Sequence, residues 1–114
     1  MYSPLLKLYK LHEDVLSPSY ATIDSACFDL RAYLSSSPIV LYTRSNVKYE
    51  VLPSPTTDPL NICLLPHERA LIPTGLIFDI PKGYSVRLHI RSSMAAKLGV
   101  SLANSQGVID SDYV

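Results

Sequence analysis

The 114-residue sequence has no tryptophan, only four glycines and two cysteines, and no net charge, because ten Lys and Arg balance ten Asp and Glu. Without net charge there is no broad electrostatic field, so we expect neither nucleic acid nor an anionic membrane as a partner. No apolar run approaches the roughly 18 residues of a membrane span, and no charged segment leads into an apolar one. The sequence therefore predicts a soluble protein that is not exported and lies in the cytoplasm, or in the host cytoplasm or nucleus if its source is a virus.

The two cysteines, Cys27 and Cys63, lie 36 residues apart and belong to no CxxC motif. No histidine stands at the spacing of a metal site, which argues against zinc. A disulfide between them stays open, but we expect two buried free thiols in a reducing compartment.

Proline and short apolar segments are abundant by contrast. Nine prolines, and short stretches rich in Val, Ile, Leu and Tyr, favour an all-β protein. A chain of this length suffices for one domain, residues 1–114, with its own core. Strands are expected over residues 5–11, 39–42, 47–52, 62–65, 70–73 and 76–80. A type I turn is expected over residues 80–83, with Pro81 second and Gly83 fourth. Short strands with frequent turns indicate a sandwich or a jelly roll.

The stretch on which the functional prediction depends begins at residues 86–91 (VRLHIR), where apolar and basic residues alternate. This period of two predicts a strand with one apolar and one basic face. Ser92 and Ser93 stand where the N-cap of a short helix is expected, and Gly99 is placed to end that helix. Arg91 and two hydroxyls would then meet the unpaired N–H groups of a helix N-terminus, an arrangement suited to an anion.

Residues 100–113 predict a hairpin with an acidic second strand. Turn residues at 104–107 (NSQG) separate the apolar residues on either side. Asp110 and Asp112 would share one strand face and Tyr113 would lie on the other. A basic anion site followed by paired carboxylates suggests a phosphate ester, with a metal ion or an activated water.

Three motifs here occur in the order found in one enzyme family. Residues 25–32 (SACFDLRA), 91–100 (RSSMAAKLGV) and 107–114 (GVIDSDYV) resemble the first three signature motifs of the trimeric dUTPases. Residues 65–75 resemble the stretch that usually precedes the second motif. The resemblance implies a distorted jelly roll of the dUTPase β-clip type, with one short helix, assembled as a homotrimer. It also implies hydrolysis of dUTP to dUMP and pyrophosphate, with Mg²⁺ as cofactor.

The resemblance assigns a role to each matching residue. Asp110 matches the carboxylate that activates the attacking water. Asp29 matches the first-motif aspartate, which helps to place Mg²⁺, here expected through a water. Arg91 and Ser92 match residues that contact the phosphates, and Ser93 stands where many members have glycine and is expected beside them.

The third motif and the turn before it are expected to hold the uracil. Asn104 offers a donor and an acceptor to the pyrimidine, and Gly107 lets the backbone approach closely. Tyr113 would pack beneath the deoxyribose, where a 2′-hydroxyl would clash. In the family this pocket lies between subunits. The substrate-binding residues expected in this part of the chain are Asn104, Gly107, Val108, Ile109 and Tyr113.

Taken singly, the same residues have ordinary explanations. Asp29 could be a solvated edge carboxylate, Asp110 a hairpin carboxylate and Tyr113 a strand aromatic. Arg87 and His89, on the face of the strand that bears Arg91, could contact phosphate or only face solvent.

Two departures from the family pattern leave other functions open. Residues 35–61 are expected to be an insertion that contains a hairpin and a proline-rich surface loop. The chain is expected to stop within a strand, as a truncated form, because the family's two further motifs do not follow. The alternatives are an enzyme related to dCTP deaminase and a non-catalytic nucleotide-binding or structural jelly roll.

Overall fold

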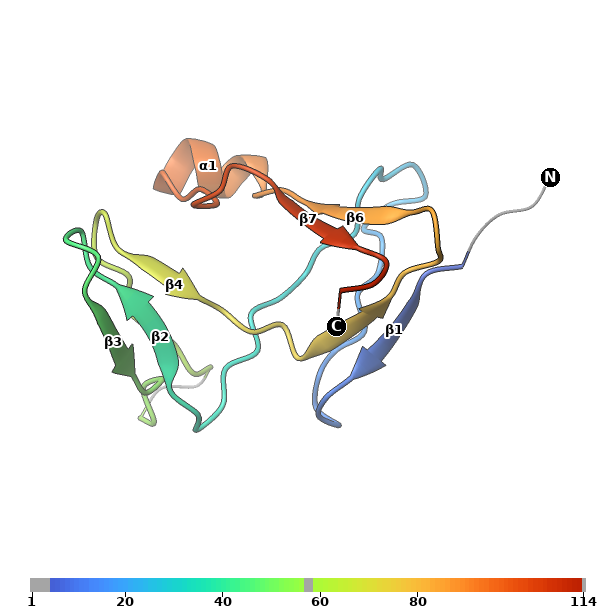
Figure 1. The fold of residues 1–114 in the computed structure, drawn as a ribbon. Coiled ribbons are helices and arrows are strands. Elements are labelled where there is room, and N and C mark those ends of the chain that lie inside the picture. The colour runs from blue at the N-terminus through green and yellow to red at the C-terminus, as the bar shows by residue number, and fades with distance from the viewer. Residues whose placement is uncertain (1–4, 57–58, 114) are drawn as a thin grey trace. The chain divides into compact units, whose positions relative to one another are not determined.

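Short strands and one short helix, joined by longer loops, form the structure, a computed structural model that describes residues 5–56 and 59–113 (Figure 1). The all-β prediction with one short helix is confirmed. In the described ranges, no helix is long and apolar enough to cross a membrane. The elements are β1 (Lys7–Lys10), β2 (Ile39–Tyr42), β3 (Lys48–Val51), β4 (Arg69–Leu71), β5 (Leu76–Asp79), β6 (Ser85–Leu88), α1 (Ser92–Leu98) and β7 (Gly107–Asp110).

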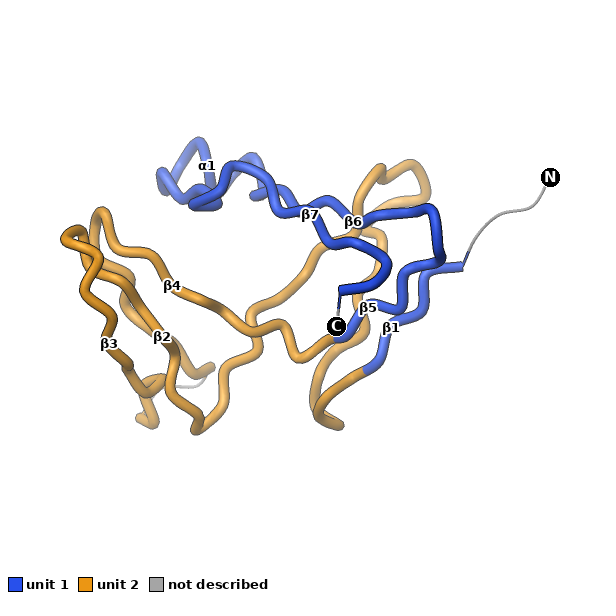
Figure 2. The backbone as a smooth tube through the Cα atoms, in the orientation of Figure 1, with its two compact units in different colours: residues 1–9, 77–114 blue, residues 10–76 orange. Residues whose placement is uncertain are grey.

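The described strands form three small sheets, which are consistent with the predicted jelly-roll fold. Their strand orders are β1-β5, β3-β2-β4 and β6-β7. The chain divides into two compact units (Figure 2). Unit 1 comprises Met1–Tyr9 and Ile77–Val114, and unit 2 comprises Lys10–Leu76.

The β2–β3 hairpin of unit 2 is formed as the sequence predicts. The strands run antiparallel, with Leu41 opposite Tyr49, and the turn is closed by a hydrogen bond from the Asn46 N–H to the Thr43 carbonyl (2.8 Å). On the other side, β2 pairs antiparallel with β4. Ile39 and Leu41 are buried on one face of β2, because alternate strand residues point to the same side.

Of the other expected strands, three are confirmed: β1 and β5 lie within shorter bounds, and β4 begins one residue earlier and ends two residues earlier than expected. The strand expected over residues 62–65 is wrong. Residues 62–65 join no ladder, and a turn follows them: the Glu68 N–H donates to the Leu65 carbonyl (3.0 Å), and the Leu65 N–H donates to the Glu68 side chain (3.0 Å). A turn of this kind takes up backbone groups that a strand would offer to a neighbour.

The turn before β6 also differs from the expectation. Its hydrogen bond joins the Tyr84 N–H to the Pro81 carbonyl (3.0 Å), so Pro81 is the first residue and Gly83 the third. Gly83 has φ +90°, a value that the third position of a type II turn requires. The type I turn over residues 80–83 is therefore wrong by one position, because glycine takes the place that needs positive φ.

Gly75 of unit 2 is closely surrounded by side chains. Its φ is +71°, and a Cβ added there would lie 2.6 Å from Val15 Cγ2 and 3.3 Å from Tyr33 Cγ. Its carbonyl accepts the Leu11 N–H (2.9 Å). Val15 is itself buried. Only glycine combines this conformation with so close an approach.

We expect Gly75→Ala to lower the free energy of unfolding by roughly 1–2 kcal/mol for the left-handed conformation and about 1–3 kcal/mol more for overpacking. Urea denaturation measures the loss. Gly99→Ala is the matched control, because Gly99 has φ +65° and nothing within 4 Å of an added Cβ. Equal losses for the two variants would contradict the packing argument.

Candidate functional site

Strand β6 shows the predicted alternation. Val86 and Leu88 are half-buried, whereas Arg87 and the following His89 are exposed. The apolar side chains therefore lie on the side of the strand that packs against the protein, and the basic side chains face solvent. Arg91, three residues after the strand ends, is also exposed.

The helix after β6 begins differently from the prediction. Arg91 is the N-cap, with extended backbone (φ −67°, ψ 142°), and no side chain caps the helix. The Arg91 carbonyl accepts the Ala95 N–H (3.0 Å). The expected serine N-cap is therefore wrong, and Ser92 and Ser93 form the first turn of α1, both exposed.

The end of α1 is as predicted. Gly99 is the C-cap in the left-handed conformation (φ 65°), and its N–H is bonded to the Met94 carbonyl. Lys97, in the last turn, is placed favourably at the negative end of the helix dipole. Arg91, Ser92 and Ser93 thus stand in succession at the start of a helix whose end is closed by Gly99.

The predicted hairpin between residues 100–102 and β7 is wrong. Strand β7 pairs antiparallel with β6, with Leu88 opposite Gly107 and Ser85 opposite Asp110. Residues 100–102 form no strand. The reason is a tight turn at residues 102–106, which directs the chain back to β6, where unpaired backbone groups need partners.

The β6–β7 ladder distributes the third motif over two faces. Gly107 and Ile109 lie on the half-buried face with Val86 and Leu88, while Val108 and Asp110 are exposed. A Cβ added to Gly107 would lie 3.2 Å from Leu88 Cδ1. The close approach at this glycine is therefore made to the neighbouring strand.

Asp110 and Asp112 do not share a strand face, contrary to the prediction. A hydrogen bond from the Tyr113 N–H to the Asp110 carbonyl (3.2 Å) forms a turn directly after β7. The expected strand at the chain's end is therefore wrong for the described residues. Asp110 and Tyr113 are both exposed.

The β6–β7 ribbon leads into α1 at one end (Figure 1), and the register places Arg91 toward that end and Asp110 at the other. The ladder runs from Leu88 opposite Gly107 at one end to Ser85 opposite Asp110 at the other. Three residues of strand span about 10 Å, and Arg91 lies beyond the end nearer α1. Asn104 belongs to that same end, since it lies in the turn that enters β7.

Gln106 is the site residue that the sequence did not reveal. Arg87 Nη1 donates a hydrogen bond to Gln106 Oε1 (3.4 Å), and Gln106 Nε2 lies 3.2 Å from His89 Nε2. The Arg87 and His89 side chains are thus both bonded to one amide. The signal that would have identified it is the β6–β7 register, which continues to place Gln106 opposite His89.

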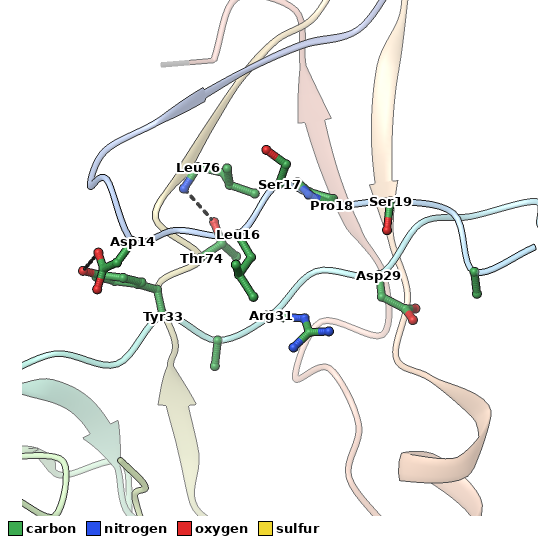
Figure 3. A pocket seen from close by; sticks show the side chains of 12 residues that line it. Asp14, Leu16, Ser17, Pro18, Ser19, Asp29, Arg31, Tyr33, Thr74 and Leu76 are labelled. Carbon is green, nitrogen blue, oxygen red and sulfur yellow. Dashed lines mark hydrogen bonds between the residues drawn. The ribbon is translucent and has the colours of Figure 1, made fainter. Parts of the chain in front are cut away.

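The first motif, residues 25–32, lies in unit 2. Its side chains alternate between half-buried and exposed as predicted, but the segment forms no β-strand. Phe28 and Leu30 are half-buried, whereas Asp29 and Arg31 are exposed. Asp29 lines a cavity of about 610 Å³ (Figure 3). Asp29 and Arg31 project from the same side of their segment in this view.

Tyr33 forms another wall of that cavity. Its hydroxyl donates to Asp14 Oδ1 (2.7 Å), and its ring stacks on His12, with centroids 4.8 Å apart. The hydrogen bond to the Asp14 carboxylate is the main reason why the pKa of Tyr33 is raised above its usual value; desolvation and the carboxylate charge add to it. The chain directly after the first motif is therefore linked by Tyr33 to the segment that contains His12 and Asp14.

Metal-binding groups are few in the described chain. No cluster of three or more His, Cys, Asp or Glu side chains occurs among residues 5–56 and 59–113. Cys27 and Cys63 are free, as expected, but both are exposed, so their predicted burial is wrong. The physical reason is that the segments bearing them lie at the surface of a unit with few buried side chains.

These features define the class: an all-β protein in which a basic strand leads to Arg91 and a serine-led helix, and a paired strand ends in a carboxylate. No family model matches the chain. Comparison with curated proteins nevertheless shows relatives over most of its length.

The relatives described here are deoxyuridine 5′-triphosphate nucleotidohydrolases. The chain is 40% identical over 112 residues to the one from Agrobacterium fabrum, covering 96% of this chain and 58% of that protein. It is 37% identical over 107 residues to that of Bdellovibrio bacteriovorus (94% and 54%) and 38% identical over 101 residues to that of Wolbachia sp. subsp. Drosophila simulans (89% and 50%). The chain spans about half the length of these relatives. These similarities, over most of the chain, support its membership in the deoxyuridine 5′-triphosphate nucleotidohydrolase family, the dUTPases, and bear out the resemblance.

We expect Asp14→Ala to lower the pKa of Tyr33 toward the usual value of about 10. A raised pKa means that folding favours the neutral phenol, so this stabilisation is present below the usual pKa and is lost as the pH rises through the raised one. Titration of the tyrosine Cζ resonances by NMR measures the shift. Tyr49 is an internal control, because its pKa is raised chiefly by its hydrogen bond to Glu68. An unchanged Tyr33 titration would contradict the assignment.

Proposed function

We propose that the chain acts in the hydrolysis of dUTP to dUMP and pyrophosphate, with Mg²⁺, within a homotrimer. The observation that carries the proposal is its 37–40% identity, over nearly all of its length, to proteins named deoxyuridine 5′-triphosphate nucleotidohydrolase. The exposed positions of Arg91 and Asp110 support it, because both must be accessible to substrate.

The phosphates would bind where β6 leads into α1. Arg91 supplies the positive charge, and Ser92 and Ser93 supply hydroxyl donors within the same helical turn. Arginine suits this role because its planar group donates hydrogen bonds to phosphate oxygens in pairs. These residues would hold and orient the triphosphate, which accounts for much of the catalysis in phosphoryl transfer.

Asp110 would act on water. At the exposed end of β7, its carboxylate can accept a proton from a water molecule aligned with the α-phosphorus. Assistance of this kind typically accelerates a reaction by roughly 10²- to 10⁴-fold. The β6–β7 ladder holds the backbone of Asp110 opposite Ser85 and so restrains the direction of the carboxylate.

Recognition of the base would use the turn before β7. Asn104 is exposed there and can offer both a donor and an acceptor. Backbone groups from Gly107 to Ile109 would complete the polar edge, and Tyr113 would cover the deoxyribose. A site that hydrogen-bonds the uracil edge rejects cytosine strongly, because cytosine leaves buried polar groups unpaired.

The separation of Arg91 from Asp110 along one ribbon supports the homotrimer. A triphosphate held at Arg91 would lie toward the other end of the ribbon from its own Asp110. A site that uses both residues would therefore take them from different copies of the chain. The exposed apolar side chains, such as Leu71 and Leu98, are available for contacts between copies.

Mg²⁺ fits the donor set that the chain offers. It usually binds nucleotides through phosphate oxygens, waters and one or two carboxylates, rather than in an all-protein cage. Asp29, on the wall of the unit 2 cavity, would supply such a carboxylate through a water. When bound, the ion would neutralise charge on the phosphates. The cytoplasmic location, the insertion at residues 35–61 and the single domain stay predictions.

The substrate is tested by measuring pyrophosphate release from dUTP, dCTP, dTTP and UTP with Mg²⁺. We expect release from dUTP alone. Ammonia release from dCTP would instead indicate the deaminase-related alternative. Nucleotide binding without pyrophosphate release would indicate the non-catalytic alternative.

Asp110→Asn is expected to lower kcat by roughly 10²- to 10⁴-fold and to leave dUMP affinity within a few-fold, because the side chain acts on water rather than on the base. Steady-state kinetics and calorimetric titration with dUMP measure the two quantities. Asp79→Asn, another exposed carboxylate of unit 1, is the control and should be unchanged. Equal losses of rate and affinity would refute the role of Asp110.

Asp29→Asn is expected to raise the Mg²⁺ concentration for half-maximal rate by roughly 10- to 100-fold, as the loss of a residue that is hydrogen-bonded to a metal ligand does elsewhere. A Mg²⁺ titration at saturating dUTP checks this. Asp24→Asn, an exposed aspartate in the same unit, is the control. An unchanged Mg²⁺ requirement would remove Asp29 from the metal site.

A further inference from the structure

We infer that Gln106 is a positioning residue, which fixes the turn bearing Asn104 through its side-chain bonds to Arg87 and His89. The inference rests on the proposed function, because it concerns how the dUTP site is held in shape.

The position of Gln106 follows from the ladder. The ladder ends with Leu88 opposite Gly107, and the same register, continued by one residue, places His89 opposite Gln106. Arg87 lies on the same face of β6, one diagonal step away. Gln106 is half-buried, whereas both of its basic neighbours are exposed. Its side chain therefore reaches from the turn across to the basic edge of β6.

The chemistry of the three side chains fixes the orientation of the amide. Arginine has no acceptor, so the Arg87 guanidinium must face the amide oxygen, 3.4 Å away. The amide NH₂ then faces His89 Nε2 at 3.2 Å and donates to it. Both ends of the amide are thus bonded to one strand, and the amide can reverse only by losing both bonds.

The turn itself needs this support. Ser105 has φ +66°, a left-handed conformation that a non-glycine residue rarely adopts. The Gln106 N–H donates to the Asn104 carbonyl (2.7 Å), and the Ser105 N–H donates to the Leu102 carbonyl (3.0 Å). These bonds are local, whereas the Gln106 side chain connects the turn to β6. Removing it would leave Asn104 on a looser turn.

The effect should fall on binding rather than on chemistry. Asp110 lies at the far end of the ladder from Gln106, so its alignment does not depend on the turn. A looser turn must be ordered when the base binds, which raises KM. Losing two exposed hydrogen bonds should raise KM roughly three- to tenfold, with kcat nearly unchanged.

The test compares Gln106→Met with the wild type. Methionine keeps the length of the side chain but cannot make either bond. Ser101→Met is the control, because it introduces the same side chain at an exposed position just before the turn. KM and kcat for dUTP and the melting temperature are measured for all three proteins. A KM within twofold of the wild type, or a loss of kcat and melting temperature at constant KM, would overturn the inference.

A double-mutant cycle with Arg87→Met tests the route of the effect. If Gln106 acts partly through Arg87, the two variants together raise KM by less than the product of their separate effects. Independent multiplication of the two effects would exclude Arg87 from the route and overturn this part of the inference.

Hydrogen exchange separates this inference from the proposed function. In nucleotide-free protein, Gln106→Met should speed exchange of the Ser105 and Gln106 amides, whatever the activity of the chain. Faster exchange in Gln106→Met, together with a wild-type chain that does not turn over dUTP, would refute the proposed function and leave the positioning role intact. Unchanged exchange in Gln106→Met, together with normal dUTP turnover by the wild type, would refute the positioning role and leave the proposed function intact.

Discussion

The pairing of β6 with β7 is the constraint on which the candidate site depends. Because side chains alternate along a strand, a slip of one residue would move Asp110 from the exposed face to the half-buried one. Gly107 helps to prevent that slip, since the Leu88 side chain occupies the space that any larger residue would need. The contact of Gly107 with Leu88, on the half-buried face of the ribbon, thus helps to keep Asp110 on the exposed face.

The same ladder positions α1, although the helix is not part of it. The helix has seven residues and none of them is buried, so neither its length nor its packing accounts for its stability. It is held at its start by the chain leaving β6 and closed at its end by Gly99. Arg91 and the two serines therefore owe their positions to the strand before them more than to the helix.

Local features of this chain could be predicted from sequence, and non-local pairing could not. The alternation in β6, the β2–β3 hairpin and the Gly99 cap each depend on a few adjacent residues. The partner of β7 depends on a choice between two apolar segments, residues 86–88 and 100–102. Hairpin statistics favour the nearer segment, but the ladder forms with the more distant one.

The errors at single residues have equally specific causes. Serine is a strong N-cap residue, but the extended backbone of Arg91 begins α1 one residue earlier. Proline favours the second position of a turn, yet the positive φ of Gly83 moves that turn by one residue. The bonds of Gln106 could be foreseen only after the register was known.

Burial explains why a single copy is an incomplete description of the proposed enzyme. Among the described residues, the buried apolar side chains are Val15, Ile39, Leu41 and Ile80, whereas Ile23 is 99% exposed and Leu98 is 70% exposed. A core this small contributes little against the conformational entropy lost on folding, and the proposed contacts between copies of the chain would add to it. The separation of Arg91 from Asp110 also favours assembly, because the proposed general base must lie close to the bound phosphates in order to act. Assembly would then satisfy both requirements at once, by covering apolar surface and by bringing the carboxylate of one copy to the phosphates held by another.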